Sequence, residues 1–329
     1  MDQENVLITG ATGFLGPILA SRLLEDSKYH VYLTDLVPPR VPENSSNPQN
    51  CFAIQADLTD PESLQKVLSI APKWHAIFSF HGIMSVDSED HPDLSLKVNV
   101  DATRAFLLAI AALGKKAVKK PRVIYASSTA VYGTPYSQGL VTDDTPATPD
   151  GVYGTHKLMT ELFINDLHRR GLLDAFSIRL PAVIIRPGVA SRSAAAFLSG
   201  MVREPMAGLE CVIPTKDRSI HNVICSPRVM VENCVRVMKA PSDAMPRHIR
   251  AVYMPGIVVT IQEMIDAFVK VCGEDKLKLL REESDAMAER LLRSWPQNVE
   301  FGNAKRMGLA FDESCEQIFQ EYVNSLKSL

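Results

Sequence analysis

The stretch VLITGATGFLG, residues 6–16, places an apolar run directly before three glycines and the start of a second apolar pattern. This order is typical of a buried strand, a tight turn and a helix. Glycines in such a turn let backbone N–H groups approach an anion at the helix N-terminus, where the helix dipole favours negative charge. Tight turns also use glycine for purely steric reasons, so the residues that follow decide between the two interpretations.

An acidic residue ends the next apolar run. Asp35 follows Val31–Thr34 and lies 19 residues beyond Gly16. In a dinucleotide-binding turn, a carboxylate at this spacing accepts hydrogen bonds from the adenosine ribose and repels a 2′-phosphate. Turn capping is the alternative role for Asp35. Together with the glycines, Asp35 predicts NAD as the cofactor rather than NADP. The predicted contacts of the loop are Gly10, Thr12, Gly13, Phe14, Leu15 and Gly16.

Short apolar runs alternate with helical patterns through the first half of the chain. The candidate strands are Val6–Thr9, Val31–Thr34, Cys51–Gln55, Ala76–Phe80, Arg122–Ala126 and Ala175–Arg179. The helical patterns between them lie near 14–25, 61–70, 94–113 and 153–170. This alternation predicts an α/β protein with a Rossmann-type, doubly wound parallel sheet.

The pattern becomes less regular after Arg179. A short apolar helix is expected near 194–203, a helix over 226–240, a strand over Ile249–Met254 and a mainly helical tail over 260–329. We therefore expect an NAD-binding Rossmann domain over 1–180, to which 220–258 returns. A smaller, mainly helical substrate-binding portion is expected over 181–219 and 259–329.

Composition excludes several classes of protein. A net charge of −3 over 329 residues argues against a nucleic-acid surface, which needs a strong basic excess. No apolar run is long enough to span a membrane, and no secretory signal is visible. The six cysteines form no CxxC pair and no metal-ligand spacing, so they predict reduced, buried thiols and no metal site. The expected location is the cytoplasm.

The sequence YGTHK at 153–157 pairs a phenol with an ammonium. On a helix, Tyr153 and Lys157 stand at positions i and i+4 and therefore share a face. A tyrosine ordinarily ionises near pH ~10, too high for a general base at neutral pH. A neighbouring Lys⁺ and a positive nicotinamide ring favour the phenolate and lower its pKa. A lone pattern of this kind is common on surface helices, so it needs a partner hydroxyl.

That partner lies in YASSTAVYG, residues 125–133, at the end of the candidate strand Arg122–Ala126. Ligands bind at the carboxyl ends of strands in such sheets, so Ser128 is placed to bond the reacting oxygen of a substrate. Ser127 and Thr129 are alternatives to it, or turn residues that satisfy local backbone groups. Ser128, Tyr153 and Lys157 are the predicted catalytic residues.

These segments together resemble the extended short-chain dehydrogenase/reductases, the NAD-dependent epimerase/dehydratase family. The resemblance rests on GATGFLG at 10–16, Asp35, ADL at 56–58, NVD at 99–101, SSTAVYG at 127–133 and YGTHK at 153–157. It implies that Ser128 orients the substrate oxygen, Tyr153 exchanges the proton and Lys157 binds the nicotinamide ribose. Members of the family are often homodimers through two helices, one of which carries the tyrosine, so a homodimer is one expected assembly.

The resemblance also assigns further cofactor contacts. Asp57 and Leu58 would flank the adenine, and Asn99 would support the cofactor site. Phe80, His81 and Gly82 lie where the family usually has small residues beneath the pyrophosphate. His81 there either touches the phosphates or only fills space. Pro181 and Val183, in the loop after the sixth strand, complete the expected set.

Further segments are VTDDTPATP at 141–149, RLPAVIIRPG at 179–188, REP at 203–205, SPR at 226–228 and SWP at 294–296. Together they resemble the D-erythronate dehydrogenase group of this family, which oxidises the C2 hydroxyl of a four-carbon sugar acid. Nucleotide-sugar epimerases usually carry an asparagine in the loop after the sixth strand, where this chain has Pro181-Ala182-Val183. A buried carboxylate needs a cationic partner. The predicted substrate contacts are Ser85, Ser128, Tyr153, Arg186, Arg192, Ser193, Arg218 and His221. For each arginine, a solvated surface role is the alternative.

The leading hypothesis is therefore an enzyme of carbohydrate metabolism that oxidises a secondary hydroxyl of a small sugar acid with NAD. The alternatives are an NAD-dependent nucleotide-sugar epimerase and a reductase of another small carbonyl compound. An NAD-binding protein without turnover is a third class, and the intact Ser128, Tyr153 and Lys157 argue against it. Nucleic acids and membranes are not expected as partners.

Overall fold

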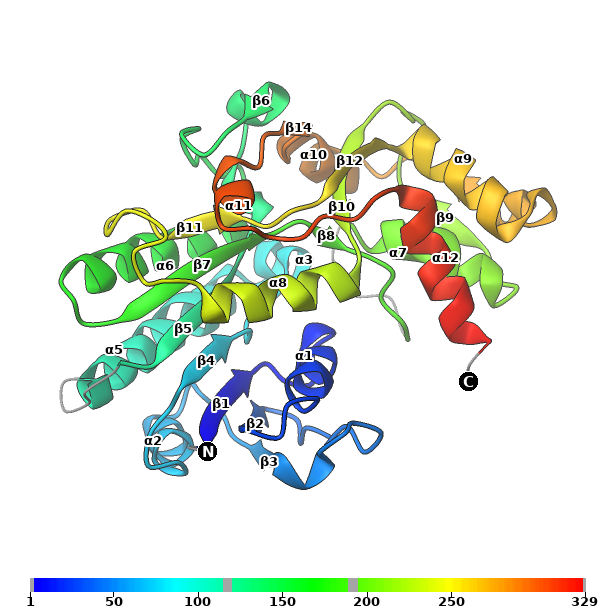
Figure 1. Ribbon diagram of the computed structural model, residues 1–329. Helices are drawn as coiled ribbons and strands as arrows, with labels where there is room; N and C mark the ends of the chain where they lie inside the picture. The colour runs from blue at the N-terminus through cyan, green and yellow to red at the C-terminus, as the bar shows by residue number, and fades with distance from the viewer. Residues whose placement is uncertain (1–2, 115–119, 189–194, 328–329) are drawn as a thin grey trace.

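The computed structural model describes residues 3–114, 120–188 and 195–327. At its centre is a seven-stranded sheet with the spatial order β11-β7-β5-β4-β1-β2-β3, in which all neighbouring strands run parallel (Figure 1). The strands are β1 (Glu4–Thr9), β2 (Tyr29–Asp35), β3 (Cys51–Gln55), β4 (Ala76–Ser79), β5 (Arg122–Ser128), β7 (Asp174–Leu180) and β11 (Ala251–Tyr253). The predicted doubly wound sheet is confirmed. Its order reverses between β1 and β4, and the ends of these strands form the usual ligand crevice.

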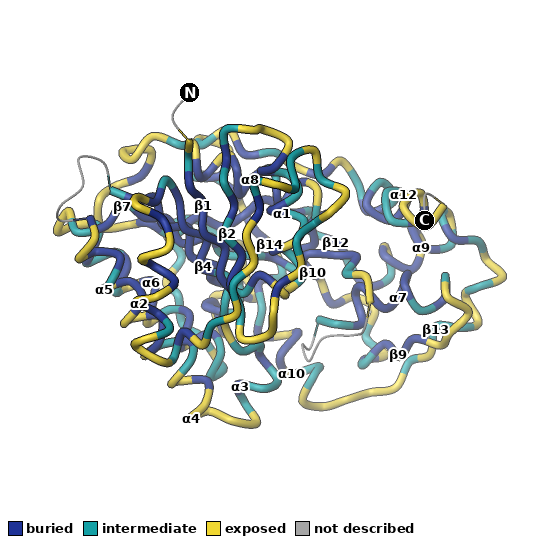
Figure 2. Tube along the Cα trace, turned by 90° about the horizontal axis from the view of Figure 1, so that it is seen from below, coloured by how far each residue is buried: buried dark blue, intermediate teal, exposed yellow. Residues whose placement is uncertain are grey.

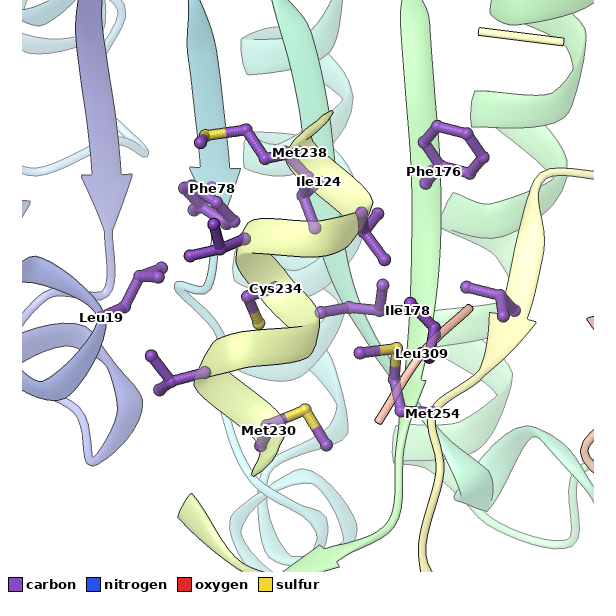
Figure 3. Close-up of a cluster of buried hydrophobic side chains, with 14 of the residues drawn as sticks. Leu19, Phe78, Ile124, Phe176, Ile178, Met230, Cys234, Met238, Met254 and Leu309 are labelled. Atoms are coloured by element: carbon purple, nitrogen blue, oxygen red, sulfur yellow. The ribbon is translucent and has the colours of Figure 1, made fainter. Parts of the chain in front are cut away.

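Helices cover both faces of this sheet. On one face lie α1 (Leu15–Leu23) and α8 (Pro227–Lys239), which share a hydrophobic core with the sheet. On the other lie α2 (Pro61–Ser69), α5 (Thr103–Gly114) and α6 (Val152–Arg169). Figure 3 shows Met230, Cys234 and Met238 of α8 directed at side chains of the strands. Each fully buried aliphatic side chain contributes about 1.5–3 kcal/mol, so these faces hold the sheet between its helices.

The inner strands of the main sheet are buried along most of their length, whereas the edge strand β3 is largely exposed and the outer helices are exposed on one side (Figure 2). All six cysteines are free and buried within the hydrophobic cores. None of the helices in the described ranges is both long and apolar enough to cross a membrane.

The segment predicted as one helix over 94–113 is interrupted. The chain passes through α3 (Ser85–Asp90), α4 (Pro92–Ser95), a π-helical turn η2 (Leu96–Ala102) and then α5. A π-turn inserts an extra residue into the helix and is frequent at functional sites. Short 3₁₀ turns occur at η1 (Pro48–Asn50), η3 (Thr129–Val131), η4 (Tyr136–Gln138) and η5 (Glu274–Leu279).

A second hydrophobic core lies beside the carboxyl ends of the strands. Its helices are α7 (Ala196–Met206), α9 (Ile261–Cys272), α10 (Ala286–Ser294) and α12 (Cys315–Leu326). A three-stranded sheet joins β8 (Ala182–Val183), β10 (His221–Cys225) and β12 (Ile257–Thr260). The strand pair β9 (Cys211–Ile213) with β13 (Leu280–Glu282) also packs into this core, whereas the pair β6 (Leu140–Val141) with β14 (Asn298–Val299) packs into the first core.

The division into a Rossmann domain and a substrate-binding portion stays a prediction, with two segments that the structure places differently. Residues 221–225 form β10, which pairs with β8 and β12 rather than with the main sheet. Its side chains alternate between the cores, with Val223 and Cys225 in the first and Ile224 in the second. Conversely, Phe301 and Leu309, on either side of α11 (Gly302–Arg306), pack into the first core. A sequence pattern shows that a segment is apolar, but not which partner buries it.

Candidate active site

The glycine loop follows β1 and opens α1. Gly10 has a φ of 64°, and a Cβ built there would lie 2.6 Å from the backbone N of His81. At Gly16 a Cβ would lie 2.5 Å from the carbonyl oxygen of Ala11. Side chains at these positions would therefore collide with backbone. Glycine at these positions lets the loop pack closely against the chain after β4 and against its own turn. The resulting glycine cradle places backbone at the N-terminus of α1, where the helix dipole favours an anionic group such as a pyrophosphate.

Asp35 ends β2 and binds the glycine loop. Its Oδ2 accepts hydrogen bonds from the Thr12 backbone N–H at 2.9 Å and from the Thr12 hydroxyl at 2.5 Å, while Oδ1 accepts from the Leu36 N–H at 2.7 Å. Asp35 thus caps this turn. A carboxylate has about four acceptor positions, so this role leaves capacity for ribose hydroxyls.

The residues proposed to flank the adenine lie beyond β3. Asp57 is exposed, and its Oδ1 accepts a hydrogen bond from the Thr59 N–H at 2.8 Å. The Leu58 side chain is buried in the core beneath α2 and α5. The polar group therefore faces solvent at the end of the strand while the apolar one anchors the turn.

His81 follows β4, beneath the glycine loop. Its Nδ1 lies 2.6 Å from the Thr9 hydroxyl and its Nε2 lies 3.1 Å from the Thr103 hydroxyl. Its ring also packs edge-on against Phe106. Burial lowers the pKa of His81 to about 4, so the ring is neutral. Both ring nitrogens are engaged, and this favours the space-filling role over a contact between the imidazole and phosphates.

Asn99 lies in the π-helical turn η2 and holds the chain after Gly82. Its Oδ1 accepts from the Ile83 N–H at 2.8 Å, and its Nδ2 donates to the Ile83 carbonyl at 3.1 Å. A Cβ on Gly82 would lie 2.8 Å from this Oδ1 and 3.4 Å from Lys157 Nζ. Asn99 therefore supports the segment that separates the glycine loop from Lys157.

The structure brings Tyr153, Lys157 and Ser128 together. Tyr153 and Lys157 share a face of α6, and Lys157 Nζ lies 5.5 Å from the centre of the Tyr153 ring. Ser128 is the last residue of β5, next to α6. Burial raises the pKa of Tyr153, whereas a hydrogen bond with Ser128 and the charge of Arg186 lower it.

Lys157 is buried, and its Nζ donates to the Ala126 carbonyl at 2.8 Å. Burial lowers the pKa of Lys157 to about 8, and the charge of Glu161 opposes this shift. The ammonium also lies 4.9 Å from the centre of the Tyr125 ring. A buried ammonium beside a phenol stabilises the phenolate, as the proton-transfer role of Tyr153 requires.

Sequence reasoning missed Glu161, one turn beyond Lys157 on α6. It is 1% exposed, and its Oε2 forms a 2.6 Å ion pair with Arg179. Its Oε1 accepts a hydrogen bond from the Ser127 hydroxyl. The spacing Tyr153, Lys157, Glu161 at every fourth residue was the available signal. Ser127 is therefore a structural residue that fixes the end of β5 beside Ser128.

The predicted substrate contacts separate in the structure. The charge of Arg186 lowers the pKa of Tyr153. Its guanidinium carbon is 5.7 Å from the centre of the Phe14 ring. Pro181, between β7 and β8, and Val183, the last residue of β8, are both buried. Arg186 Nε donates to the Val183 carbonyl at 3.3 Å. Arg186 therefore joins the tyrosine to the glycine loop.

The remaining substrate candidates are less well placed. Arg218 is 46% exposed, and Glu282 and Gln262 accept its hydrogen bonds. His221 is exposed at the far end of β10 from Cys225, which pairs with Val183. Ser85 is buried at the start of α3. Arg192 and Ser193 lie outside the described residues.

Comparisons with known proteins agree with this geometry. Residues 6–221 match the model of the NAD dependent epimerase/dehydratase family. Two proteins named D-erythronate dehydrogenase, from Haemophilus influenzae and Cupriavidus necator, are each 32% identical, over 97% of this chain and 98% of their own.

Solved structures share the architecture. A structure described as a nucleoside-diphosphate-sugar epimerase from Agrobacterium tumefaciens superimposes with a TM-score of 0.91 at 32% identity, over 100% of this chain and 96% of that one. The L-threonine 3-dehydrogenase of Trypanosoma brucei gives a TM-score of 0.85 at 21% identity, over 98% and 97% of the two chains. The second likeness concerns the fold alone.

Proposed function

The chain belongs to the NAD-dependent epimerase/dehydratase family and is an NAD-dependent oxidoreductase, and we propose that its substrate is a small sugar acid such as D-erythronate, oxidised at the C2 hydroxyl. The observation that carries this proposal is the position of Arg186. The half-buried Arg186 guanidinium packs over Phe14 of the glycine loop, and its charge lowers the pKa of Tyr153. It supplies the cation that a substrate carboxylate next to the reacting carbon needs.

Ser128, Tyr153 and Lys157 carry the proton transfer in this proposal. The Ser128 hydroxyl orients the substrate oxygen, and the Tyr153 phenolate accepts the proton of the C2 hydroxyl. Lys157 keeps the phenolate stable through its charge and is placed to bind the nicotinamide ribose. When bound, NAD supplies the hydride acceptor that turns the secondary alcohol into a carbonyl.

The residues around the glycine loop fit NAD. The cradle at Gly10 and Gly16 leaves no room for a Cβ, and Asp35 lies at its edge. Gly10, Thr12, Gly13, Phe14, Leu15 and Gly16 would hold the pyrophosphate. Asp35, Asp57 and Leu58 would hold the adenosine, and Gly82 and Asn99 would border the ribose near Lys157.

Asp35→Ala is expected to narrow the preference for NAD over NADP. The variant loses the acceptor for ribose hydroxyls and the negative charge that repels a 2′-phosphate. Because hydrogen bonds to a charged acceptor are lost, kcat/KM with NAD should fall by roughly 10- to 100-fold. Steady-state kinetics with both cofactors measure this, with the exposed turn residue Asp26→Ala as the control. Equal efficiency with NAD and NADP in the unmodified protein would contradict the assignment.

Arg186→Ala is expected to lower kcat/KM for the sugar acid by roughly 10- to 150-fold, because a charge-assisted hydrogen bond in a partly buried site is lost. The neutral lactone or amide of the same compound should lose far less. The matched control is Arg218→Ala, which removes an exposed guanidinium that Glu282 already neutralises. Should Arg186→Ala slow the acid and the lactone by the same factor, Arg186 does not bind a carboxylate.

We further propose a homodimer through the outer faces of α5 and α6. These helices lie against each other and expose Leu108, Met159 and Leu162, of which Leu162 is 60% exposed. Large adjacent apolar side chains on a surface favour association. Light scattering of the purified protein tests this assembly, and a monomer at micromolar concentration would contradict it.

A further inference from the structure

Helix α7 holds the backbone of Arg186 from both sides of the residue. The Arg186 N–H donates to the Ser199 hydroxyl oxygen at 3.1 Å. The Arg186 carbonyl accepts a hydrogen bond from Arg203 NH1 at 2.7 Å. Ser199 and Arg203 are four residues apart on α7 and therefore share one face of the helix. One helix face thus satisfies both backbone polar groups of a single loop residue.

Both α7 residues are themselves firmly held. Ser199 is 3% exposed and Arg203 is 9% exposed. Helix α7 also packs into the second hydrophobic core through Leu198, Met201 and Val202. The second guanidinium nitrogen of Arg203 pairs with Glu204, which neutralises its charge. Arg203 is consequently committed to protein partners.

The same residues line a pocket between β8 and α7. Its walls are formed by Ala182, Val183, Ile184, Arg186, Ala195, Ala196, Ser199 and Arg203. The backbone of Arg186 is clamped on this side, while its guanidinium lies over Phe14 and its charge lowers the pKa of Tyr153. The two ends of Arg186 thus connect the second core to the active site.

We propose that Ser199 and Arg203 are positioning residues that hold the Arg186 guanidinium where a substrate carboxylate binds. This inference rests on the proposed function, because it assigns to α7 the support of the carboxylate contact. A long, flexible side chain binds a planar carboxylate well only when the backbone that carries it is fixed. Each backbone or side-chain torsion that must be ordered on binding costs free energy. Anchoring the N–H and the C=O of Arg186 fixes that backbone.

The test is a double-mutant cycle. Ser199→Ala and Arg203→Met are each made in the unmodified protein and in Arg186→Ala. We expect each change alone to lower kcat/KM for the sugar acid by about 3- to 10-fold, the usual effect of losing one supporting hydrogen bond, with less than about 2-fold for the lactone. In the Arg186→Ala background, neither change should lower kcat/KM for the sugar acid further, because the guanidinium that Ser199 and Arg203 position is gone.

Binding supplies a readout independent of turnover. With Tyr153→Phe as the common background and NAD present, calorimetry measures the Kd of D-erythronate directly. Ser199→Ala should weaken this Kd by the same factor as it lowers kcat/KM. Arg203→Lys, which keeps a charge and a donor, should lie closer to the unmodified protein than Arg203→Met.

The matched control is Val202→Ala. It lies on the same helix within the second core and makes no hydrogen bond to Arg186. Val202→Ala should lower Tm, and it should change kcat/KM for the acid and for the lactone by the same factor. If Arg203→Met fails to fold, Ser199→Ala carries the test alone.

Three outcomes overturn the inference. In the first, Ser199→Ala lowers kcat/KM for the acid and the lactone equally. In the second, it leaves both values unchanged. In the third, its effect on kcat/KM for the acid is undiminished in the Arg186→Ala background. In these cases Arg186→Ala still separates the acid from the lactone, and the proposed function stands. If Arg186→Ala itself fails to separate them, the carboxylate contact is wrong and the inference falls with it.

Discussion

Tyr153→Phe should lower kcat by ~10²–10⁴, the usual contribution of a positioned proton-transfer group. The variant keeps the ring and its packing but has no hydroxyl to accept or return a proton. Because the ring does not line the glycine cradle, the affinity for NAD should change little. Steady-state kinetics with the sugar acid and calorimetry with NAD measure the two effects separately.

The control for this variant is Tyr136→Phe, which removes a phenol from the exposed turn η4. It should leave kcat unchanged. A Tyr153→Phe protein that binds NAD poorly but turns over normally once saturated would refute the proton-transfer role.

Lys157→Met should lower kcat by at least ~10², since it removes the charge that stabilises the phenolate. It should also move the pH dependence. In the unmodified protein the ammonium favours loss of the Tyr153 proton, while burial raises the pKa of that phenol. Without Lys157, burial is opposed by the hydrogen bond with Ser128 and by the charge of Arg186. The rising limb of kcat against pH should therefore move to higher pH.

The groups that face Lys157 are Tyr125 on β5, Tyr153 and Glu161 on its own helix, and the neutral His81 beyond β4. Of these, Glu161 is the carboxylate that favours the ammonium. The control is Lys270→Met, which removes a 67% exposed ammonium from the second core's surface. A Lys157→Met protein whose pH profile coincides with that of the unmodified protein would contradict this account of the pair.

The main sheet could be predicted because its strands are continuous apolar runs between turn residues. Strand β3 has the predicted bounds, Cys51–Gln55. Strand β5 starts at Arg122 as predicted and ends at Ser128, two residues beyond the predicted Ala126. Strand β8 escaped prediction because it has only two residues. Strand β10 is as long as β3, but it pairs with β8 and β12 outside the main sheet, and its own sequence does not indicate those partners. The π-turn over Leu96–Ala102 was also invisible, since its apolar pattern is that of an ordinary helix.

The candidate site likewise contains residues that the sequence places together and contacts that only the fold creates. Tyr153 and Lys157 share a helix, so their spacing alone places them together. The contacts of Arg186 with Phe14, and of α7 with Arg186, join residues distant in sequence, and no spacing indicates them. His81 shows a further limit. Its position left a phosphate contact and a space-filling role equally open, and the Thr9 and Thr103 hydroxyls that engage its ring became visible only in the structure.

We propose that this oxidoreductase oxidises a small sugar acid and then releases the reducing equivalents as free NADH. The most direct measurement incubates the protein with excess NAD and a panel of C4–C6 aldonic acids and nucleoside-diphosphate sugars, and follows the absorbance of NADH. We predict net NADH formation with one or more of the acids, D-erythronate foremost, and none with the nucleotide sugars. Interconversion of a nucleotide sugar without net NADH, together with no reaction of any acid, would contradict the proposal and identify an epimerase.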